Sequence, residues 1–381
     1  MFLYSLLSVP AIDVFEPIAK WLTISVLSAL LILGAVLYFV KRNAFVKYVK
    51  YAFLGAFAYL LTIAIVFFVL DMSNHYSDAY AEENWLDKDA LVRYVLIPLL
   101  VFSSVALLSL ATFALTNKFA QKYHRLCGII GGVLSALALI AVLICIAIYY
   151  NVKIDGDGYY NSDTATVQQL FLYIGAILTV ALIIGLATLD KQAFHFDARS
   201  LAYAGILASM SFALSYIKLW DMPQGGSITL VSTLPLMLYA YLFGTKKGVF
   251  VGFVYGILQS VQDPWIIHPA QFLLDYPIAF SAIGLAGIFG ESKFLEKAPQ
   301  ARFALGATIA GALRFICHVL SGVFAFEAYA EGQHAWAYSL AYNSFVFIDV
   351  AFVIIAGLFV LSSNAFLSAT THLRKNNKKQ K

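Results

Sequence analysis

The stretch LCGIIGGVLSALALIAVLICIAIY, residues 126–149, decides the fold class of this chain. It contains no charged side chain and is built mostly from alanine, leucine, isoleucine and valine. One helical crossing of a bilayer needs about 20 predominantly apolar residues. The stretch is therefore predicted to be a transmembrane helix and not a helix of a water-soluble core.

The composition of the whole chain points the same way. Of its 381 residues, 61% are hydrophobic and 12% are charged, and the mean hydropathy is +0.81. Soluble domains carry about 25% charged residues, so this chain lies well outside that class. Because a membrane span must satisfy its own backbone hydrogen bonds, we expect an all-α integral membrane protein.

Apolar runs between polar breaks predict about eleven transmembrane helices. The predicted spans are 18–40, 51–70, 91–116, 126–149, 168–189, 200–219, 228–243, 248–262, 271–290, 302–325 and 336–361. The first run is longer than a typical signal-peptide core and lacks an obvious cleavage site, so we interpret it as a helix of the mature protein.

Lysine and arginine predict the orientation, because cytoplasmic loops are enriched in both. With the amino terminus outside, most of the 25 basic residues fall in cytoplasmic segments and most acids fall outside. The basic groups lie in 41–50, 118–125, 191–199, 246–247, 293–302 and 374–381. An odd number of spans keeps the basic tail, residues 362–381, in the cytoplasm.

The net charge of +4 follows from these loops. The dense run from Arg374 to Lys381 is expected to contact anionic lipid or solvent. A nucleic-acid surface would need clustered basic and aromatic residues on a soluble face, so we expect the lipid bilayer and no nucleic acid as a partner.

A polar segment, LDKQAFHFDARS at 189–200, divides the chain into two halves. Residues 1–190 would form a five-helix module, and residues 200–361 a six-helix domain. The first five helices carry almost no ionisable residue at membrane depth, where such residues usually mark function. They are interpreted as scaffold, interaction surface or regulator, and their role stays open.

The second half collects polar and aromatic residues near helix ends that are predicted to face outside. They are Trp220–Ser227, Gln259, Gln262–Trp265, His268–Pro269, Gln271, Asp275–Pro277, Arg314, His318, Trp336, Tyr338, Tyr342, Asn343 and Asp349. Most of these belong to segments that enter or leave the membrane on one side. We therefore expect a single polar, aromatic pocket that opens outward.

Asp275 is the most informative of these residues, because an unpaired carboxylate within the membrane costs about 2.5–3.5 kcal/mol. It could be offset by Arg314 or could bind a ligand. Asn343 likewise needs a hydrogen-bond partner on a neighbouring helix or on a ligand. Aromatic faces stabilise an organic cation and a carboxylate pairs with an amidine-like edge, so the pocket suits a flat, nitrogen-rich cation.

Enzyme and metal chemistry find little support in the sequence. It contains neither an HExxH nor a GxSxG pattern, and no nucleophile has a base at suitable spacing. Cys127, Cys145 and Cys317 lack the spacing of a zinc site or a disulfide framework. We expect no catalytic residue, no cofactor and no metal.

Four segments together resemble the thiamine-specific S component family of energy-coupling factor transporters. They are MPQGGSITL at 222–230, LQSVQDPWIIHPAQFLLDYPIAF at 258–280, RFICHVLSG at 314–322 and YSLAYN at 338–343. The resemblance covers about 200–361 and implies a six-helix bundle that binds thiamine in an outward-facing pocket. It also implies an ATP-driven complex with a membrane scaffold subunit and two ATPase subunits.

The resemblance assigns ligand contacts residue by residue. The acidic position falls on Asp275, where the family often has glutamate, and a tryptophan of the family falls on Phe326, which lacks an indole N–H. The implied substrate-binding residues are Trp265, Asp275, Tyr276, His318, Phe326, Tyr338 and Asn343. Ala204 and Ala208, at small-xxx-small spacing, would contact the scaffold helix, although alanine is also ordinary in a membrane helix.

We therefore expect a substrate-capture subunit for thiamine uptake and not an enzyme. Two alternatives stay open. A stand-alone secondary carrier for a small cationic heterocycle would use the extra helices in place of the motor, but the first half lacks titratable residues. An intramembrane enzyme acting through Asp275 and His318 would need a metal or nucleophile that the sequence does not offer.

Overall fold

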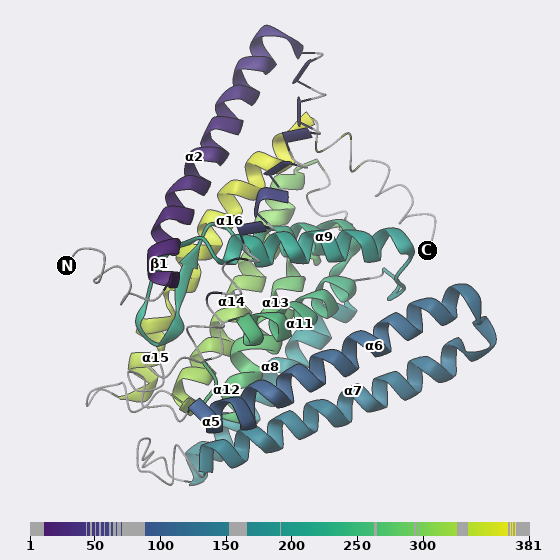
Figure 1. Ribbon diagram of the computed structural model, residues 1–381, viewed down its shortest axis with the longest axis vertical. Helices are drawn as coiled ribbons and strands as arrows, with labels where there is room; N and C mark the ends of the chain where they lie inside the picture. Colours follow the sequence, from purple (N-terminus) through teal and green to yellow (C-terminus); the bar gives the residue numbers. More distant parts are fainter. Residues whose placement is uncertain are drawn as a thin grey trace.

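The computed structural model describes residues 11–42, 88–151, 166–190, 192–262, 265–292, 295, 297–325 and 334–364, with scattered positions in 44–70 and 366–370. Within these ranges the protein is helical apart from one two-stranded sheet. Figure 1 shows a compact bundle from which α2 (Ala11–Val40) rises at one end and a long helical hairpin extends to one side.

The amino-terminal half contributes this hairpin and one helix against the bundle. Its elements after α2 are α5 (Lys88–Leu91), η1 (Val92–Leu96), α6 (Ile97–Phe119), α7 (Gln121–Tyr149) and α8 (Thr166–Thr188). Helices α6 and α7 meet at Ala120, whose extended φ of −147° breaks the helical run. They then pack side by side along their length (Figure 1).

The carboxy-terminal half forms the bundle itself. Its elements are α9 (Ala198–Ser215), β1 (Lys218–Asp221), η3 (Pro223–Gly225), β2 (Ser227–Thr229), α10 (Leu234–Phe243), α11 (Thr245–Gln262), α12 (Pro269–Leu273), η4 (Leu274–Ile278), α13 (Ala279–Ile283), η5 (Gly284–Gly287), α14 (Pro299–Ala325), α15 (Ala335–Asn343) and α16 (Phe345–Ser362).

The prediction of an all-α membrane protein is confirmed. Among the described residues, six helical runs are long and apolar enough to cross a membrane, and two shorter apolar helices accompany them. The long runs are Pro17–Val40, Asp89–Phe113, Gln121–Tyr149, Pro269–Gly287, Pro299–Ala325 and Ala335–Ser362. Nine of the twenty positions in the predicted span 51–70, and the whole basic run 371–381, lie outside the described residues.

Two predicted spans are shorter than expected because a β-hairpin separates them. The span predicted over 200–219 ends as a helix at Ser215, and the one predicted over 228–243 becomes helical at Leu234. Between them β1 pairs antiparallel with β2, with Lys218 opposite Thr229 and Asp221 opposite Ser227. Gly225 turns the chain with a φ of +82°, a conformation that glycine adopts without strain.

The core lies where α10 crosses the bundle, and every residue of α10 is buried. Helix α14 runs the length of the bundle and packs against α13, α15, α16 and α8. At Gly256 of α11 a side chain would collide with the backbone of Tyr276 and Pro277. Glycine at this position lets α11 approach η4 closely, and η4 carries Asp275.

The predicted boundary near residue 190 is a point of contact between the two halves. The Asp190 carboxylate accepts a hydrogen bond from the backbone N–H of Thr245 at 2.7 Å, so it caps α11. Lys246 donates to the backbone carbonyl of Gln192 at 3.2 Å. Helix α8 continues this contact along α14, so the linker is packed against the bundle.

Candidate ligand-binding site

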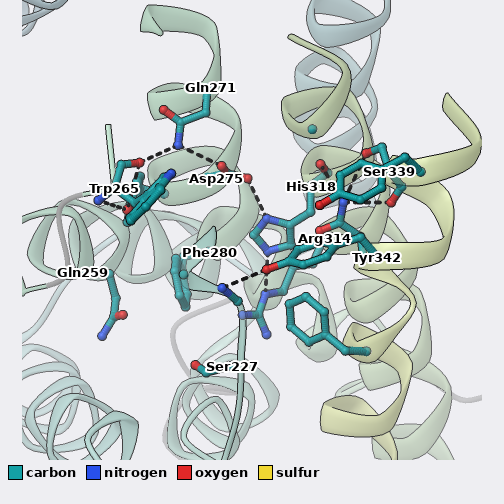
Figure 2. Close-up of a pocket in the computed structure, with 17 residues that line it drawn as sticks. Ser227, Gln259, Trp265, Gln271, Asp275, Phe280, Arg314, His318, Ser339 and Tyr342 are labelled. Carbon is teal, nitrogen blue, oxygen red and sulfur yellow. Dashed lines mark hydrogen bonds and ion pairs between the residues drawn. The ribbon is translucent and has the colours of Figure 1, made fainter. Parts of the chain in front are cut away.

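About half of the sequence-predicted polar and aromatic residues line a pocket at one end of the bundle, whereas Trp220, Gln262, His268, Trp336 and Asp349 do not line it. Figure 2 shows Asp275 and His318 pointing toward one another across it, with Trp265 on one side and Tyr342 on the other. The lining residues are Gly225, Gly226, Ser227, Gln259, Trp265, Gln271, Asp275, Tyr276, Phe280, Arg314, His318, Gly322, Tyr338, Ser339, Tyr342, Asn343 and Phe345.

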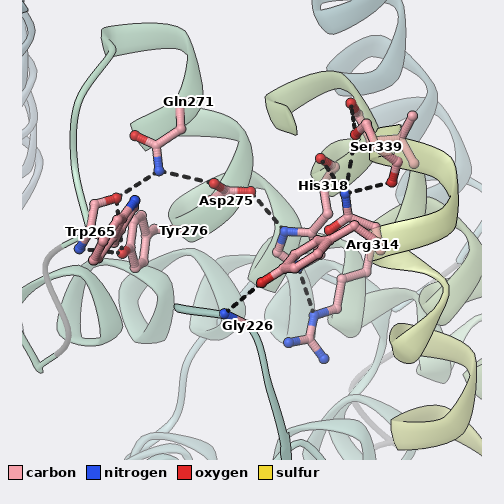
Figure 3. Close-up of polar contacts among 11 residues, drawn as sticks. Gly226, Trp265, Gln271, Asp275, Tyr276, Arg314, His318 and Ser339 are labelled. Carbon is pink, nitrogen blue, oxygen red and sulfur yellow. Dashed lines mark hydrogen bonds and ion pairs between the residues drawn. The ribbon is translucent and has the colours of Figure 1, made fainter. Parts of the chain in front are cut away.

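Asp275 is held between two neighbours. It lies on η4, a π-helical turn that contains Pro277, and proline removes a backbone donor from a helix. Its Oδ2 accepts from Nε2 of Gln271 at 2.9 Å, and its Oδ1 lies 2.8 Å from Nδ1 of His318. Figure 3 shows this row of contacts. The carboxylate is therefore fixed in orientation while it still lines the pocket.

Arg314 does not pair with Asp275, one of the two possibilities that the sequence left open. Its Nη1 donates instead to Oδ2 of Asp349 on α16 at 3.1 Å, and both side chains are buried or nearly so. Its guanidinium also lies 5.1 Å from the centre of the Phe280 ring. The positive charge at the pocket is thus neutralised by a carboxylate behind it.

The contacts around His318 assign the roles of its two ring nitrogens. Arg314 Nε donates to His318 Nε2 at 3.3 Å, so Nε2 must accept. The proton then lies on Nδ1 and is donated to Asp275. The two carboxylates and one guanidinium sum to a formal charge of −1 at the site.

Trp265 and Tyr276 form a second wall. The backbone N–H of Trp265 donates to the Tyr276 hydroxyl at 3.0 Å, and Gln271 Nε2 donates to the Trp265 carbonyl at 2.8 Å. Within the described chain, the buried indole Nε1 of Trp265 has no hydrogen-bond partner. This wall therefore offers an aromatic face and one unused donor.

Helix α15 supplies the opposite wall. The rings of Tyr338 and Tyr342 stack with centroids 5.9 Å apart, and Asn343 lines the pocket with them. Asn343 Nδ2 donates to the carbonyls of His318 at 3.2 Å and Ser339 at 2.9 Å. From the sequence we expected Asn343 to bond to a neighbouring helix or to a ligand, and in the structure it bonds to α14.

The β-hairpin lines the pocket next to α15 and bonds to Tyr342. The hydroxyl of Tyr342 donates to the carbonyl of Pro223 and accepts from the backbone N–H of Gly226, the latter at 3.1 Å. A side chain at Gly226 would meet this hydroxyl at 2.5 Å. A glycine at 226 thus allows the hairpin to come this close to the ring.

Sequence reasoning did not assign several lining residues to the site. Phe280, Ser339 and Phe345 line the pocket beside the assigned ones. Phe280 and Ser339 belong to the segments 258–280 and 338–343 that carry the family resemblance. Membership in these segments could have indicated that both residues belong to the site. Phe326, predicted to stack on a ligand, lies outside the described residues.

The predicted helix-contact residues lie on α9, away from the pocket. Ala204 is 7% exposed and packs into the bundle core, and Ala208 is partly buried against the same core. The open face of α9 carries Ala202 and Gly205 instead, and nothing lies within 4 Å of a side chain placed at Gly205. Leu201 and Ile206, which are 51% and 40% exposed, lie on the same open face.

No group of three or more histidine, cysteine or acidic side chains is arranged for a metal ion in the part of the chain that the structure describes. Cys127, Cys145 and Cys317 are free thiols.

Comparison with known proteins gives consistent results. The model of the family described as "Thiamine transporter protein (Thia_YuaJ)" matches residues 201–368. The chain is 34% identical over 144 residues to "Thiamine transporter ThiT" of Bacillus subtilis strain 168, covering 36% of this chain and 74% of that protein. It is 29% identical over 170 residues to "Thiamine transporter ThiT" of Lacticaseibacillus paracasei, covering 40% of this chain and 82% of that protein.

A solved structure is also similar. "Native-SAD phasing for ThiT from Listeria monocytogenes serovar" matches 46% of this chain and 97% of its own chain at 23% identity, with a TM-score of 0.38. The relatives are named as transporters and not as enzymes. Since the match to the Bacillus subtilis protein covers most of that relative, this multi-pass membrane chain belongs to the thiamine transporter protein family.

Proposed function

We propose that the chain captures thiamine in the pocket between η4, α14 and α15 and serves as the substrate-binding component of an energy-coupling factor transporter. The observation that carries the proposal is the formal charge of −1 among Asp275, Arg314 and Asp349 in a pocket walled by aromatic rings. The two relatives named as thiamine transporters support the same ligand.

The chemistry of thiamine fits this pocket. The molecule joins a flat aminopyrimidine to a thiazolium ring that is permanently positive. Rings such as Trp265, Tyr276 and Tyr338 stabilise an organic cation by about 0.5–2 kcal/mol each. Asp275 supplies a carboxylate for charge-assisted hydrogen bonds, and His318, which donates to it, keeps that carboxylate in place.

The proposed site residues are Trp265, Asp275, Tyr276, His318, Tyr338 and Asn343, and Phe326 stays a sequence-based prediction. Asp275 and the aromatic rings would contact the ligand. Asn343 gives its amide protons to backbone and Ser339 acceptors, so its oxygen would be the atom that is left for a ligand.

We further propose that the pocket opens to the outside. Helix α11 begins at the basic pair Lys246 and Lys247 and ends at Gln262 near the pocket, about 27 Å away for 18 residues. The positive-inside rule places the basic turn in the cytoplasm. The amino terminus would then be outside and the carboxy terminus inside.

ATP hydrolysis would come from partner subunits, since the sequence has no P-loop pattern. A membrane scaffold subunit would dock on α9, whose small residues permit close helix packing. Residues 1–190 would form a five-helix module that accompanies the six-helix thiamine-binding domain 200–361.

The test is a titration of the purified full-length protein with thiamine and with its free aminopyrimidine half, which lacks the thiazolium charge. We expect saturable quenching of tryptophan fluorescence by thiamine and much weaker binding of the uncharged half. Equal affinity for both compounds would show that the negative charge of the pocket does not contribute to binding. Absence of thiamine binding up to about 1 mM, a free energy near −4 kcal/mol, would overturn the proposed ligand.

A further inference from the structure

The outer end of the α6–α7 hairpin packs directly behind the pocket wall. Leu91 of α5, Val95 of η1 and Leu99 of α6 are at most 1% exposed, as are Ile146 and Tyr149 of α7. They form one buried cluster with Ile266, Ile267 and Phe272, which belong to the segment between Trp265 and Asp275. In Figure 1 the α5 end of the hairpin lies beside α12.

The segment from Trp265 to Asp275 therefore has two faces. Trp265, Gln271 and Asp275 line the pocket, whereas Ile266 and Ile267 are 2% and 4% exposed against the hairpin. The hairpin supplies apolar packing on the face turned away from the pocket, beside the contacts that α11 makes with η4 and that α14 makes with α12 and η4.

His268 links the hairpin to this segment. Its ring meets the edge of the Tyr150 ring at 5.0 Å and 88°, and it stacks on Phe324 at 5.5 Å and 19°. Its Nδ1 accepts from the backbone N–H of Ala270 at 3.1 Å and so caps α12. Burial lowers the pKa of His268 to about 4, which keeps Nδ1 free to accept at neutral pH.

Hydrogen bonds of Gln271 connect α12 to the side chains that face the pocket. Gln271 lies on α12, and its Oε1 accepts a hydrogen bond from the backbone N–H of Ile267 at 3.2 Å. Its Nε2 donates both to the Trp265 carbonyl and to Asp275. A shift of the α12 start would therefore move the indole and the carboxylate together.

The rest of the hairpin is different. Farther from the pocket, Leu107 and Leu108 on α6 are 60% and 69% exposed, and Ile129 on α7 is 56% exposed. These side chains face the surroundings, as expected of a lipid-facing surface. Close packing against the bundle is thus concentrated at the end of the hairpin that lies behind Trp265–Asp275.

We propose that the outer end of the α6–α7 hairpin is a positioning element of the binding site, with Tyr150 acting through His268 on Trp265 and Asp275. The proposal rests on the proposed function for its ligand and goes beyond it in giving residues 91–150 a part in affinity. Tyr150 is a positioning residue, since it touches neither the pocket nor the ligand site.

The test compares three variants of the full-length protein. Tyr150→Ala removes the ring, Tyr150→Phe keeps it, and Tyr123→Ala removes a 53% exposed tyrosine at the other end of α7 as a matched control. Thiamine titration should show Tyr150→Ala weakened by about two- to tenfold, the size of one edge-to-face ring contact. Tyr150→Phe and Tyr123→Ala should bind like the unsubstituted protein.

A second readout needs no ligand. The emission of Trp265, obtained by subtracting the spectrum of Trp265→Phe, should shift to longer wavelength in Tyr150→Ala because the indole meets more water. It should stay unchanged in Tyr123→Ala. This readout distinguishes the two proposals, since it tests the positioning role even where the unsubstituted protein binds no thiamine.

Should Tyr150→Ala fail to fold, Tyr150→Leu replaces it, because leucine keeps an apolar side chain at this position but offers no ring to His268. Loss of affinity or a shifted Trp265 emission in this variant supports the proposal, and no change in either readout contradicts it. Unchanged affinity and unchanged Trp265 emission in a folded Tyr150→Ala protein would overturn it.

Discussion

Asp275 on η4 and His318 on α14 meet through a contact of 2.8 Å between Oδ1 and Nδ1, although 43 residues separate them. The partner on the other side of the imidazole is Arg314, which donates to Nε2. His318 thus links an acid that lines the pocket to a cation that is already paired with Asp349. This arrangement leaves Asp275 as the uncompensated charge of the site.

Replacing Asp275 by asparagine removes this charge with little change of shape. We expect thiamine affinity to fall by about 1.5–3 kcal/mol, the range for a hydrogen bond to a charged group, or roughly 10- to 150-fold. Titration of tryptophan fluorescence measures the effect. Asp221→Asn is the control, because Asp221 is an exposed carboxylate on β1 that does not line the pocket. An unchanged dissociation constant in folded Asp275→Asn protein would exclude Asp275 from the site.

The Arg314–Asp349 pair predicts a rescue experiment. Asp349→Asn leaves a nearly buried guanidinium unpaired, which typically costs about 3–5 kcal/mol of stability, and it raises the site charge from −1 to 0. Both the melting temperature and the thiamine affinity should fall. Adding Arg314→Gln returns the charge to −1, so the double variant should bind thiamine better than Asp349→Asn and unfold at a higher temperature.

Double-mutant analysis of the two readouts decides this prediction, because contacting residues show non-additive effects. If the double variant is as unstable and as weak in binding as the sum of the two single variants, the pair does not act as a unit. The charge count on which the proposed ligand rests would then need revision.

The sequence could group several pocket-lining residues in advance because they occur in a few short segments. Gln271, Asp275 and Tyr276 lie within six positions, and the continuous helical run of α12 and η4 keeps them near one another. The rotation of α16 against α14 cannot be read from hydropathy, so Asp349 as the partner of Arg314 could not be predicted.

Two further structural features could not be predicted from the hydropathy pattern, each for a physical reason. The β-hairpin Lys218–Thr229 lies between two apolar runs whose hydropathy alone indicates helix. The turn at Gly225 allows the chain to form two paired strands there instead. Ala204 faces the core of its own bundle, because small residues suit close packing inside a chain as well as between chains.

The capping box at the start of α9 predicts a pH dependence of stability. Asp197 Oδ1 accepts from the backbone N–H of Ser200 at 2.9 Å. Burial tends to raise the pKa of Asp197, but the hydrogen bonds from Ser200 and the nearby Lys247 charge outweigh it, and the pKa lies below 3.8. A lowered carboxylate pKa stabilises the fold above the unfolded-state pKa and loses this effect as the pH falls through the folded-state pKa.

Asp197→Asn isolates this charge, since asparagine is also a good helix cap. The unsubstituted protein should melt at a higher temperature than Asp197→Asn from about pH 5 upward. The two melting curves should converge as the pH falls below 3.8. Thermal unfolding in detergent across this range measures the gap, and a gap that grows toward acid would contradict the assigned sign.

Labelling of single introduced cysteines tests the orientation and the pocket together. Ser227 lines the pocket on the β-hairpin, whereas Ser292 follows η5 at the other end, where its carbonyl accepts from Arg302. In intact cells, an impermeant thiol reagent should label Ser227→Cys above the level of the unsubstituted chain with its three native cysteines. Thiamine should slow that reaction, because a bound ligand covers the hairpin side of the pocket. Ser292→Cys should react only after the cells are permeabilised.

Three labelling patterns have different meanings because the two positions report on separate claims. Labelling of Ser292→Cys but not Ser227→Cys in intact cells would invert the topology, since the basic loops would then face outward against the positive-inside rule. Labelling of Ser227→Cys without thiamine protection would keep the orientation but separate the hairpin from the ligand. Labelling with protection, at a thiamine concentration that matches the dissociation constant from titration, would place one thiamine site at the outer end of the bundle.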